Sequence, residues 1–255
     1  MHRYKIALAA AALAITGSTA ALAADLGSIK DPPMMSVAPG YSWSGVYGGI
    51  HIGGAWGDAD LTERLPNFFG VLPPSLSSGH DVDGWLGGLQ LGMNRQFGKV
   101  VLGVDLSLSG ADISGSNGDC FGLTTLAAGL ATVRCDTKVN WLASAMFKVG
   151  YAMDRWLVYG KVGWAVAGID HKLTGTIIPI PISVASSVNE TADGIAFGAG
   201  VEYAFGNGIS LGLEYTHMNL EADGSGLILG GILTTGSREV DLDIVRMRLN
   251  FKLGQ

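Results

Sequence analysis

The chain is short of charged side chains and of long hydrophobic runs. Charged residues account for 15% of its 255 positions and hydrophobic residues for 48%. Beyond the N-terminal segment, no stretch has the roughly 20 consecutive apolar residues that a membrane-spanning helix needs. Glycine is abundant, at 39 residues, and glycine weakens helices. This composition argues against a mostly helical soluble enzyme and favours strands that contact a large core or lipid.

Basic residues and cysteines are also few. The 16 basic residues face 22 acidic ones, a formal net charge of −6, so the chain has no electrostatic reason to bind the phosphates of nucleic acid. The only cysteines are Cys120 and Cys135. No spacing matches a known cofactor, metal or catalytic motif. The sequence therefore predicts no cofactor, no metal and no catalytic residues.

The N-terminus predicts export. A basic start, an apolar run at 6–15 and the small-residue pattern Ala21-Leu22-Ala23 are typical of a secretory signal peptide. We expect cleavage between Ala23 and Ala24. An uncleaved membrane anchor is the alternative, but residues 16–19 interrupt the apolar run before it reaches a spanning length.

Three segments follow from this N-terminus. Residues 1–23 form the signal peptide. Residues 24–42 contain three prolines and no periodic pattern, and are expected to be a periplasmic lead-in. Residues 43–255 form the remainder, which we interpret as an outer-membrane β-barrel.

Hydrophobic residues alternate with small or polar ones along this third segment, as in a sheet with one apolar face. Between 100 and 108 the even positions are all Val or Leu, and Gly103, Asp105 and Ser107 lie between them. From Val139 to Tyr151 every odd position is hydrophobic. Eight such strands are expected, at 44–57, 82–96, 100–112, 138–152, 157–170, 193–205, 209–222 and 240–253.

The connections between the expected strands alternate in length. Tight turns are expected at 97–99, 153–156 and 206–208, and long loops near 58–81, 113–137, 171–192 and 223–239. Short periplasmic turns and long outer loops are typical of outer-membrane barrels. All eight prolines lie outside the expected strands, as required because proline cannot donate to a strand ladder. The sequence predicts an all-β, eight-stranded antiparallel transmembrane up-and-down barrel in the cell outer membrane.

Aromatic residues are expected to form two girdles at the membrane interfaces. The girdle residues are Trp43, Phe97, Tyr151, Trp156, Phe205 and Phe251 at the periplasmic strand ends, and Trp56, Trp85 and Trp141 at the opposite ends. Trp164 lies in mid-strand and fits neither girdle. A secreted β-sandwich is the alternative fold, but its outward face would be polar. The non-apolar face here is rich in Gly, Ala and Ser, which suits a narrow interior.

One strand breaks the alternation. Val240, Leu242 and Ile244 follow one phase, whereas the hydrophobic residues of 245–253 follow the other. Either a bulge near Ile244 or a strand top that stands above the membrane would explain the change.

The lumen of an eight-stranded barrel is just wide enough to be filled by side chains. The inward positions carry charges of both signs: Asp105, Lys148, Lys161, Glu202, Glu214, Arg246, Arg248 and Lys252. Because buried charges are tolerated only when paired, we expect Glu202 and Glu214 to pair with Arg246 or Arg248. We interpret this interior charge network as a structural plug, and a gated, narrow ion path is the alternative.

The outer loops carry two further features. Cys120 and Cys135 fall in one long loop, and an exported chain meets oxidising conditions, so a disulfide is expected there. Free thiols or a metal pair are the alternative. The loops near 177–182 and 227–233 are unexpectedly apolar. Either the strands continue above the membrane and pack there, or these tips bind a neighbour, a host surface or a hydrophobic ligand.

Both ends of the barrel segment resemble one family. Residues 43–49, WSGVYGG, running on to Ala55-Trp56-Gly57, are similar to the first-strand signature of the proteobacterial outer-membrane immunogenic proteins. The closing residues 246–253, RMRLNFKL, and the AADL after the signal are similar too. This family comprises small porin-like surface antigens with an OmpA-type barrel. The resemblance implies surface antigenicity and a role in envelope integrity.

The function favoured at this point is a structural barrel that supports the envelope and displays surface loops. A narrow porin-like channel for ions or small solutes is the main alternative, and an adhesin or hydrophobic-ligand-binding barrel a minor one. Expected partners are outer-membrane lipid, the barrel-assembly and periplasmic chaperone machinery, and host or neighbouring surface molecules. An enzyme would need a set such as His80-Asp81 with the serines near 75–78, whose spacing matches no known motif. We predict that the protein is not an enzyme.

Overall fold

The computed structural model describes residues 41–64, 75–118, 131–177, 182–229 and 232–253. Within them every regular element is a strand. The strands are β1 (Gly45–Arg64), β2 (Ser75–Phe97), β3 (Val100–Asn117), β4 (Ala131–Met153), β5 (Trp156–Ile177), β6 (Ile182–Gly206), β7 (Ile209–Leu229) and β8 (Ile232–Leu253).

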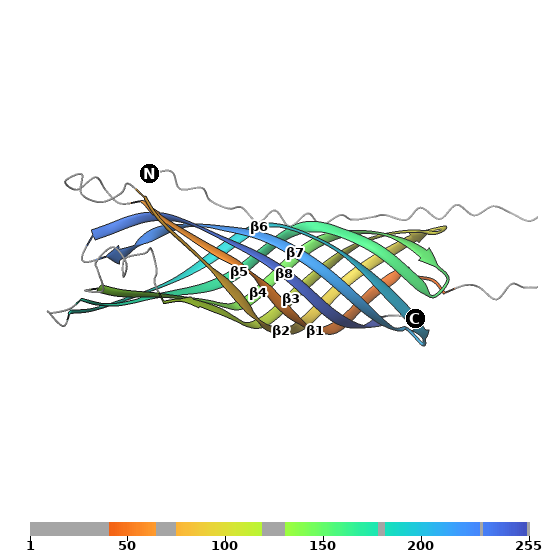
Figure 1. Ribbon diagram of the computed structural model, residues 1–255. Helices are drawn as coiled ribbons and strands as arrows, with labels where there is room; N and C mark the ends of the chain where they lie inside the picture. The colour runs from red at the N-terminus through yellow and green to blue at the C-terminus, as the bar shows by residue number, and fades with distance from the viewer. Residues whose placement is uncertain (1–40, 65–74, 119–130, 178–181, 230–231, 254–255) are drawn as a thin grey trace, which may run out of the picture. The chain divides into compact units, whose positions relative to one another are not determined.

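The eight strands form one closed antiparallel barrel (Figure 1). Each strand pairs with the next in sequence, and β1 pairs with β8, so that Tyr47 lies opposite Lys252. Closure removes the unpaired edges that could not be tolerated in lipid. The predicted fold is confirmed.

Three two-residue turns connect the strands at one end, which we call the turn end. Gly98, Asp154, Asn207 and Gly208 adopt positive φ there, at 61°, 53°, 51° and 74°. Gly, Asn and Asp tolerate this region at the lowest cost, and hairpin turns of this kind require it. The opposite end of the barrel is called the loop end.

The strands are longer than expected, and the extra length lies at the loop end. β1 continues to Arg64 rather than 57, β2 begins at Ser75 rather than 82, and β7 continues to Leu229 rather than 222. The expected bounds were too short because outward apolar residues stop where the strands leave the lipid-facing zone, whereas backbone pairing continues.

The change in hydrophobic phase along β8 also arises where this strand leaves the lipid-facing zone. The register between β1 and β8 is unbroken from Val46↔Leu253 to Arg64↔Thr235, so the bulge considered near Ile244 is absent. Val240, Leu242 and Ile244 point into the lumen and are at most 1% exposed. Arg246 and Arg248 continue the same inward row. The inward row itself is continuous, and its side chains change from charged near the turn end to apolar near the loop end.

A bulge does occur in β4. The register with β5 shifts between Val139 and Trp141, so Val139 is fully buried in the lumen while Trp141 is 39% exposed on the outer wall. The expectation that both residues share one face is wrong. The intervening Asn140 absorbs the extra position and donates a hydrogen bond to Asp170 of β5 at 2.6 Å.

Candidate functional site

The turn-side half of the outer wall is a continuous apolar belt. Large hydrophobic side chains on all eight strands are exposed there, among them Ile52, Leu89 and Leu108 at 59–65%. Exposure on this scale is expected only where lipid replaces water as the solvent. At its turn-end edge the belt exposes Phe97, Tyr151, Trp156, Phe205 and Phe251, and at its other edge Trp56, Trp85 and Trp141.

Two tryptophans belong to neither edge of the belt. Trp43 is 5% exposed and lies inside the turn-end mouth of the barrel, so its assignment to a girdle is wrong. Its amide N–H donates to Gln96 at 2.8 Å and its indole N–H to the carbonyl of Asp154 at 3.2 Å. Trp164 is exposed, and its indole N–H donates to Asp193 at 3.1 Å, which gives this ring a polar contact toward the loop end.

Apolar side chains close the mouth around Trp43. We define the mouth cluster as Trp43, Val101, Ala152, Leu157, Tyr159 and Ala204, with Tyr41 packed against it. The ring centroids of Tyr41 and Trp43 are 4.9 Å apart in an edge-on arrangement. Residues that precede β1 thus enter the barrel and fill its turn end.

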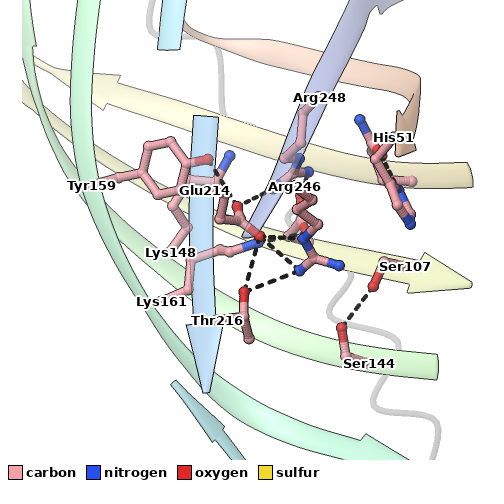
Figure 2. Close-up of polar contacts among 12 residues, drawn as sticks. His51, Ser107, Ser144, Lys148, Tyr159, Lys161, Glu214, Thr216, Arg246 and Arg248 are labelled. Atoms are coloured by element: carbon pink, nitrogen blue, oxygen red, sulfur yellow. Dashed lines mark hydrogen bonds and ion pairs between the residues drawn. The ribbon is translucent and has the colours of Figure 1, made fainter. Parts of the chain in front are cut away.

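A charge network fills the next layer of the lumen (Figure 2). Glu214 of β7 is its centre and contacts Arg246 at 2.6 Å, Lys161 at 2.7 Å and Arg248 at 2.5 Å. Asp105 of β3 contacts Lys161 at 3.1 Å and Arg248 at 2.5 Å. Arg248 and Lys161 therefore each bridge two carboxylates, and the network ties together β3, β5, β7 and β8.

Two tyrosines complete the network and enclose Lys148. The Tyr47 hydroxyl accepts from Lys148 Nζ at 2.8 Å and donates to Asp105 at 2.7 Å, while Tyr159 donates to Glu214 at 2.8 Å. Lys148 Nζ lies 4.7 Å from both ring centroids, a distance at which a cation is attracted to the ring face. A Cβ on Gly200 would lie 2.6 Å from the Tyr159 hydroxyl, so this glycine makes room for the ring.

A chain of hydrogen bonds through uncharged side chains crosses the lumen beside the network and ends at Glu202. Ser109 and Gln90 bind the two ring nitrogens of His51, at 2.7 and 2.5 Å. Gln90 donates to Asn250 at 2.8 Å, and Asn250 donates to Glu202 at 2.9 Å. These residues come from β1, β2, β3, β6 and β8, so the chain links five of the eight strands across the polar lumen.

The structure places seven of the eight predicted interior charges in this layer, and two details differ. Glu202 accepts hydrogen bonds from Ser210 and Asn250 rather than from an arginine. Lys252 lies at the mouth, partly exposed, and donates to the carbonyl of Ser42 at 3.1 Å. Sequence reasoning missed Tyr47 and Tyr159, although Tyr159 shares the inward phase of Lys161.

The loop-side half of the lumen is an apolar core. Its largest members come from six strands: Val82, Leu86, Ile113, Val139, Leu142, Met146, Ile169, Met218, Leu220, Val240, Leu242 and Ile244. None is more than 3% exposed. The outer wall at this level is polar, so inside and outside exchange roles between the two halves of the barrel.

Polar groups lie above this core toward the loop end. Arg238 of β8 pairs with Glu190 of β6, and His171 of β5 is hydrogen-bonded to Thr137 of β4 at 3.1 Å. Burial, followed by the charges of Arg238 and His80, lowers the pKa of His171 to about 4. Cys135 of β4 is 3% exposed at this end, whereas Cys120 lies outside the described residues, so the disulfide stays a prediction.

A closed barrel with an apolar belt and a filled lumen defines an integral outer-membrane β-barrel protein. In agreement, the family model of the outer membrane protein beta-barrel domain matches residues 8–235. The chain is 30% identical to the 31 kDa outer-membrane immunogenic protein of Brucella melitensis, over 95% of this chain and 97% of that protein. It is 29% identical to a 22 kDa outer membrane protein of Rhizobium leguminosarum, over 85% and 81% of the two chains.

The chain belongs to the family of outer-membrane immunogenic β-barrel proteins. Its location is therefore the outer membrane. Among solved structures it is similar to OprG from Pseudomonas aeruginosa, with 13% identity, a TM-score of 0.45, and coverage of 83% of this chain and 97% of that one.

Proposed function

We propose that the protein is a structural outer-membrane barrel whose lumen is closed and whose loop-side half holds surface loops away from the membrane. The observation that carries this proposal is the filling of the lumen in three successive layers, which are the mouth cluster, the charge network and the apolar core. A solute would have to displace all three layers.

The charge network is the highest of these barriers. Glu214 has ion pairs with three cations and lies 1% exposed. Removing one partner from a buried ion pair lowers the free energy of unfolding by about 3–5 kcal/mol. A transient path through the network would therefore be rare, and the network supports a role in holding the wall together.

The partners that fit this function are chiefly lipid and surface molecules. The apolar belt binds acyl chains of the outer membrane, and the loop tips face host or neighbouring molecules. During biogenesis the chain requires periplasmic chaperones and the barrel-assembly machinery. Envelope support follows from the braced barrel, and antigenicity from the loops that it presents.

Planar-bilayer recording of the folded, purified protein tests the closed lumen. Trp43→Ala combined with Leu157→Ala truncates two members of the mouth cluster, and Leu211→Ala with Leu213→Ala is the matched control in the belt. No stable conductance is expected from the wild type or from either variant, because two layers remain in the mouth variant. Stable single-channel openings of the wild-type monomer would overturn the proposal and favour a porin-like channel.

Such a channel would prefer anions. Lys148, Lys161, Arg246 and Arg248 outnumber Asp105, Glu202 and Glu214 in the described lumen. Reversal potentials in a salt gradient would measure this preference.

The proposed function is also not enzymatic. The ring nitrogens of His80 are buried, whereas Asp81 is exposed on the outer wall, so the two adjacent side chains point to opposite faces of β2 and form no dyad. Incubation of the folded protein with lipid and peptide ester substrates is expected to give no turnover. Turnover that disappears in His80→Gln would contradict this conclusion.

A further inference from the structure

The two edges of the apolar belt carry opposite charges. At the loop-side edge the exposed charged groups are mostly carboxylates, on β1, β2, β6, β7 and β8: Asp58, Asp60, Asp83, Asp193, Glu221 and Glu239. At the turn-end edge, Asp154 is the one exposed carboxylate among the described side chains. Arg95, Lys99 and Arg155 are exposed cations at the same edge. The turn-end edge therefore attracts anions, whereas most of the loop-side edge repels them.

The three cations lie on one continuous section of the barrel rim. Arg95 is near the end of β2, Lys99 lies in the turn between β2 and β3, and Arg155 lies in the turn between β4 and β5. The backbone N–H of Ala152, at the end of β4, donates to the carbonyl of Lys99 at 2.7 Å. This bond holds the first turn beside the strand end from which the second turn starts. We call Arg95, Lys99 and Arg155 the basic arc.

Aromatic side chains hold the basic arc at the edge of the belt. The Arg95 guanidinium lies 5.8 Å from the ring centroid of Phe97, and Lys99 Nζ lies 5.9 Å from that of Tyr151. A cation is attracted to a ring face at such distances. Both rings are exposed at the turn-end edge of the belt. The aliphatic stems of long basic side chains lie along apolar surface while their charged ends reach the polar side, so the arc lies at the height of lipid headgroups.

The charges of the basic arc are not neutralised by the protein. Within the described part of the chain, none of its members forms an ion pair with a carboxylate. Asp154 offsets one of the three charges, so two net positive charges remain. By contrast, Arg134 and Lys138 of the loop-side wall have Asp136 and Asp112 at 3.9 and 2.9 Å. The arc thus retains its charge for an external anion.

The side of the membrane on which the basic arc lies indicates which anion it meets. Short turns of outer-membrane barrels face the periplasm, so the arc is level with the headgroups of the inner leaflet. Clustered basic side chains beside a membrane attract anionic lipids. We propose that the basic arc binds the phosphate headgroups of anionic phospholipids in the inner leaflet. This inference names the class of lipid partner within the proposed function, and it rests on the belt facing lipid rather than on a closed lumen.

The test uses the full-length barrel folded in vesicles that contain phosphatidylglycerol and phosphatidylcholine in equal amounts. Native mass spectrometry after extraction into a mild detergent counts the lipids of each kind that stay bound. The wild type is expected to retain about tenfold more phosphatidylglycerol, as two net basic charges beside an anionic headgroup would give. Arg95→Gln with Lys99→Gln and Arg155→Gln should abolish this preference.

Arg134→Gln with Lys138→Gln and Lys172→Gln is the matched control, because it removes three exposed positive charges from the loop-side wall instead. It should leave the preference intact. Heat-modifiable mobility on gels confirms that each variant is folded. The proposal is overturned if the wild type shows no preference, if the basic-arc variant keeps it, or if the control loses it equally, which would indicate an effect of total charge.

Two further measurements separate the remaining outcomes. Displacement of the bound lipid by equimolar inorganic phosphate would also overturn the proposal, because it would indicate a site for free phosphate. Planar-bilayer recording of the same samples reports on the closed lumen and not on the basic arc. A conducting wild type that retains phosphatidylglycerol would therefore contradict the proposed function and leave this inference standing, and a closed wild type without lipid preference would do the reverse.

Discussion

The two halves of the barrel share one backbone architecture and use opposite chemistry. In the turn-side half the wall is apolar outside and charged inside, with Ile52 exposed and Arg248 buried. In the loop-side half the wall is polar outside and apolar inside, with Asp241 partly exposed and Leu242 buried. The same strands thus bury polar groups where the solvent is lipid and apolar groups where it is water, and the solvent decides which side chains the lumen receives.

Glu214→Gln should have the largest effect on the turn-side half. It removes the charge that Arg246, Arg248 and Lys161 share, and is expected to lower the free energy of unfolding by about 3–5 kcal/mol. Urea unfolding of the barrel in lipid vesicles measures it. Glu221→Gln, the same change on the exposed wall of β7, should alter stability by less than about 0.5 kcal/mol. Equal effects at the two positions would refute a special role for the network.

Leu242→Ala should have the next largest effect, in the loop-side half. If that lumen is a true protein core, the cavity left by this fully buried side chain costs about 2–5 kcal/mol. Leu211→Ala, on the belt wall of β7, leaves no cavity in the protein. Unfolding measured under the same conditions should show a clearly smaller loss for Leu211→Ala, and a reversed order would break the distinction between the halves.

Acid should weaken the loop-side half. The pKa of His171 is lowered to about 4 in the folded barrel and is about 6.5 when unfolded, so the unfolded state binds more protons between these values. Stability from this residue is present above about pH 6.5 and is lost as the pH falls toward 4, by ~3 kcal/mol at most. Hydrogen exchange of β5 and β8 at a series of pH values measures the loss. His171→Gln should flatten the dependence, and an unchanged profile would exclude His171 as its source.

The smallest effect is expected at the boundary between the halves. Tyr215 donates to Asp243 at 2.6 Å, and His217 contacts the same carboxylate at 2.8 Å. Tyr215→Phe removes one exposed hydrogen bond and should cost about 0.5–1 kcal/mol. Tyr203→Phe, for which the ring contacts are the described interactions, serves as the control in the same unfolding assay. A loss above 2 kcal/mol would show that the boundary is part of the core.

The sequence predicts the turn-side half far better than the loop-side half. Lipid requires an apolar side chain at every outward position, so residues such as Leu106 and Phe147 mark the strands and, by exclusion, place Asp105 and Lys148 inside. The loop-side strands carry small and polar residues on the outside, as at Ser114 and Thr191. These residues do not produce the apolar alternation that marks a strand in the sequence. Their strand ends were therefore underestimated.

Details within the lumen could not be read from alternation. The alternation of residues in β6 shows that Glu202 points inward, but it does not show which side chains lie across the barrel. The partners of Glu202 are Ser210 and Asn250, and their positions depend on the stagger of β6, β7 and β8. The position of Trp43 in the sequence is compatible both with the membrane interface and with burial inside the turn-end mouth of the barrel. The distinction depends on Gln96 and the turn at Asp154, which are far from it in sequence.

The position of Trp43 has a consequence for the order of assembly. The groups around its ring come from β3, β4, β5, β6 and the turn between β4 and β5, and its backbone amide binds Gln96 of β2. They surround Trp43 only once these strands have paired and the sheet has curled. The indole can therefore dock only after β2 to β6 have come together around it. Burial of this ring would then mark the stage of insertion at which these five strands have paired.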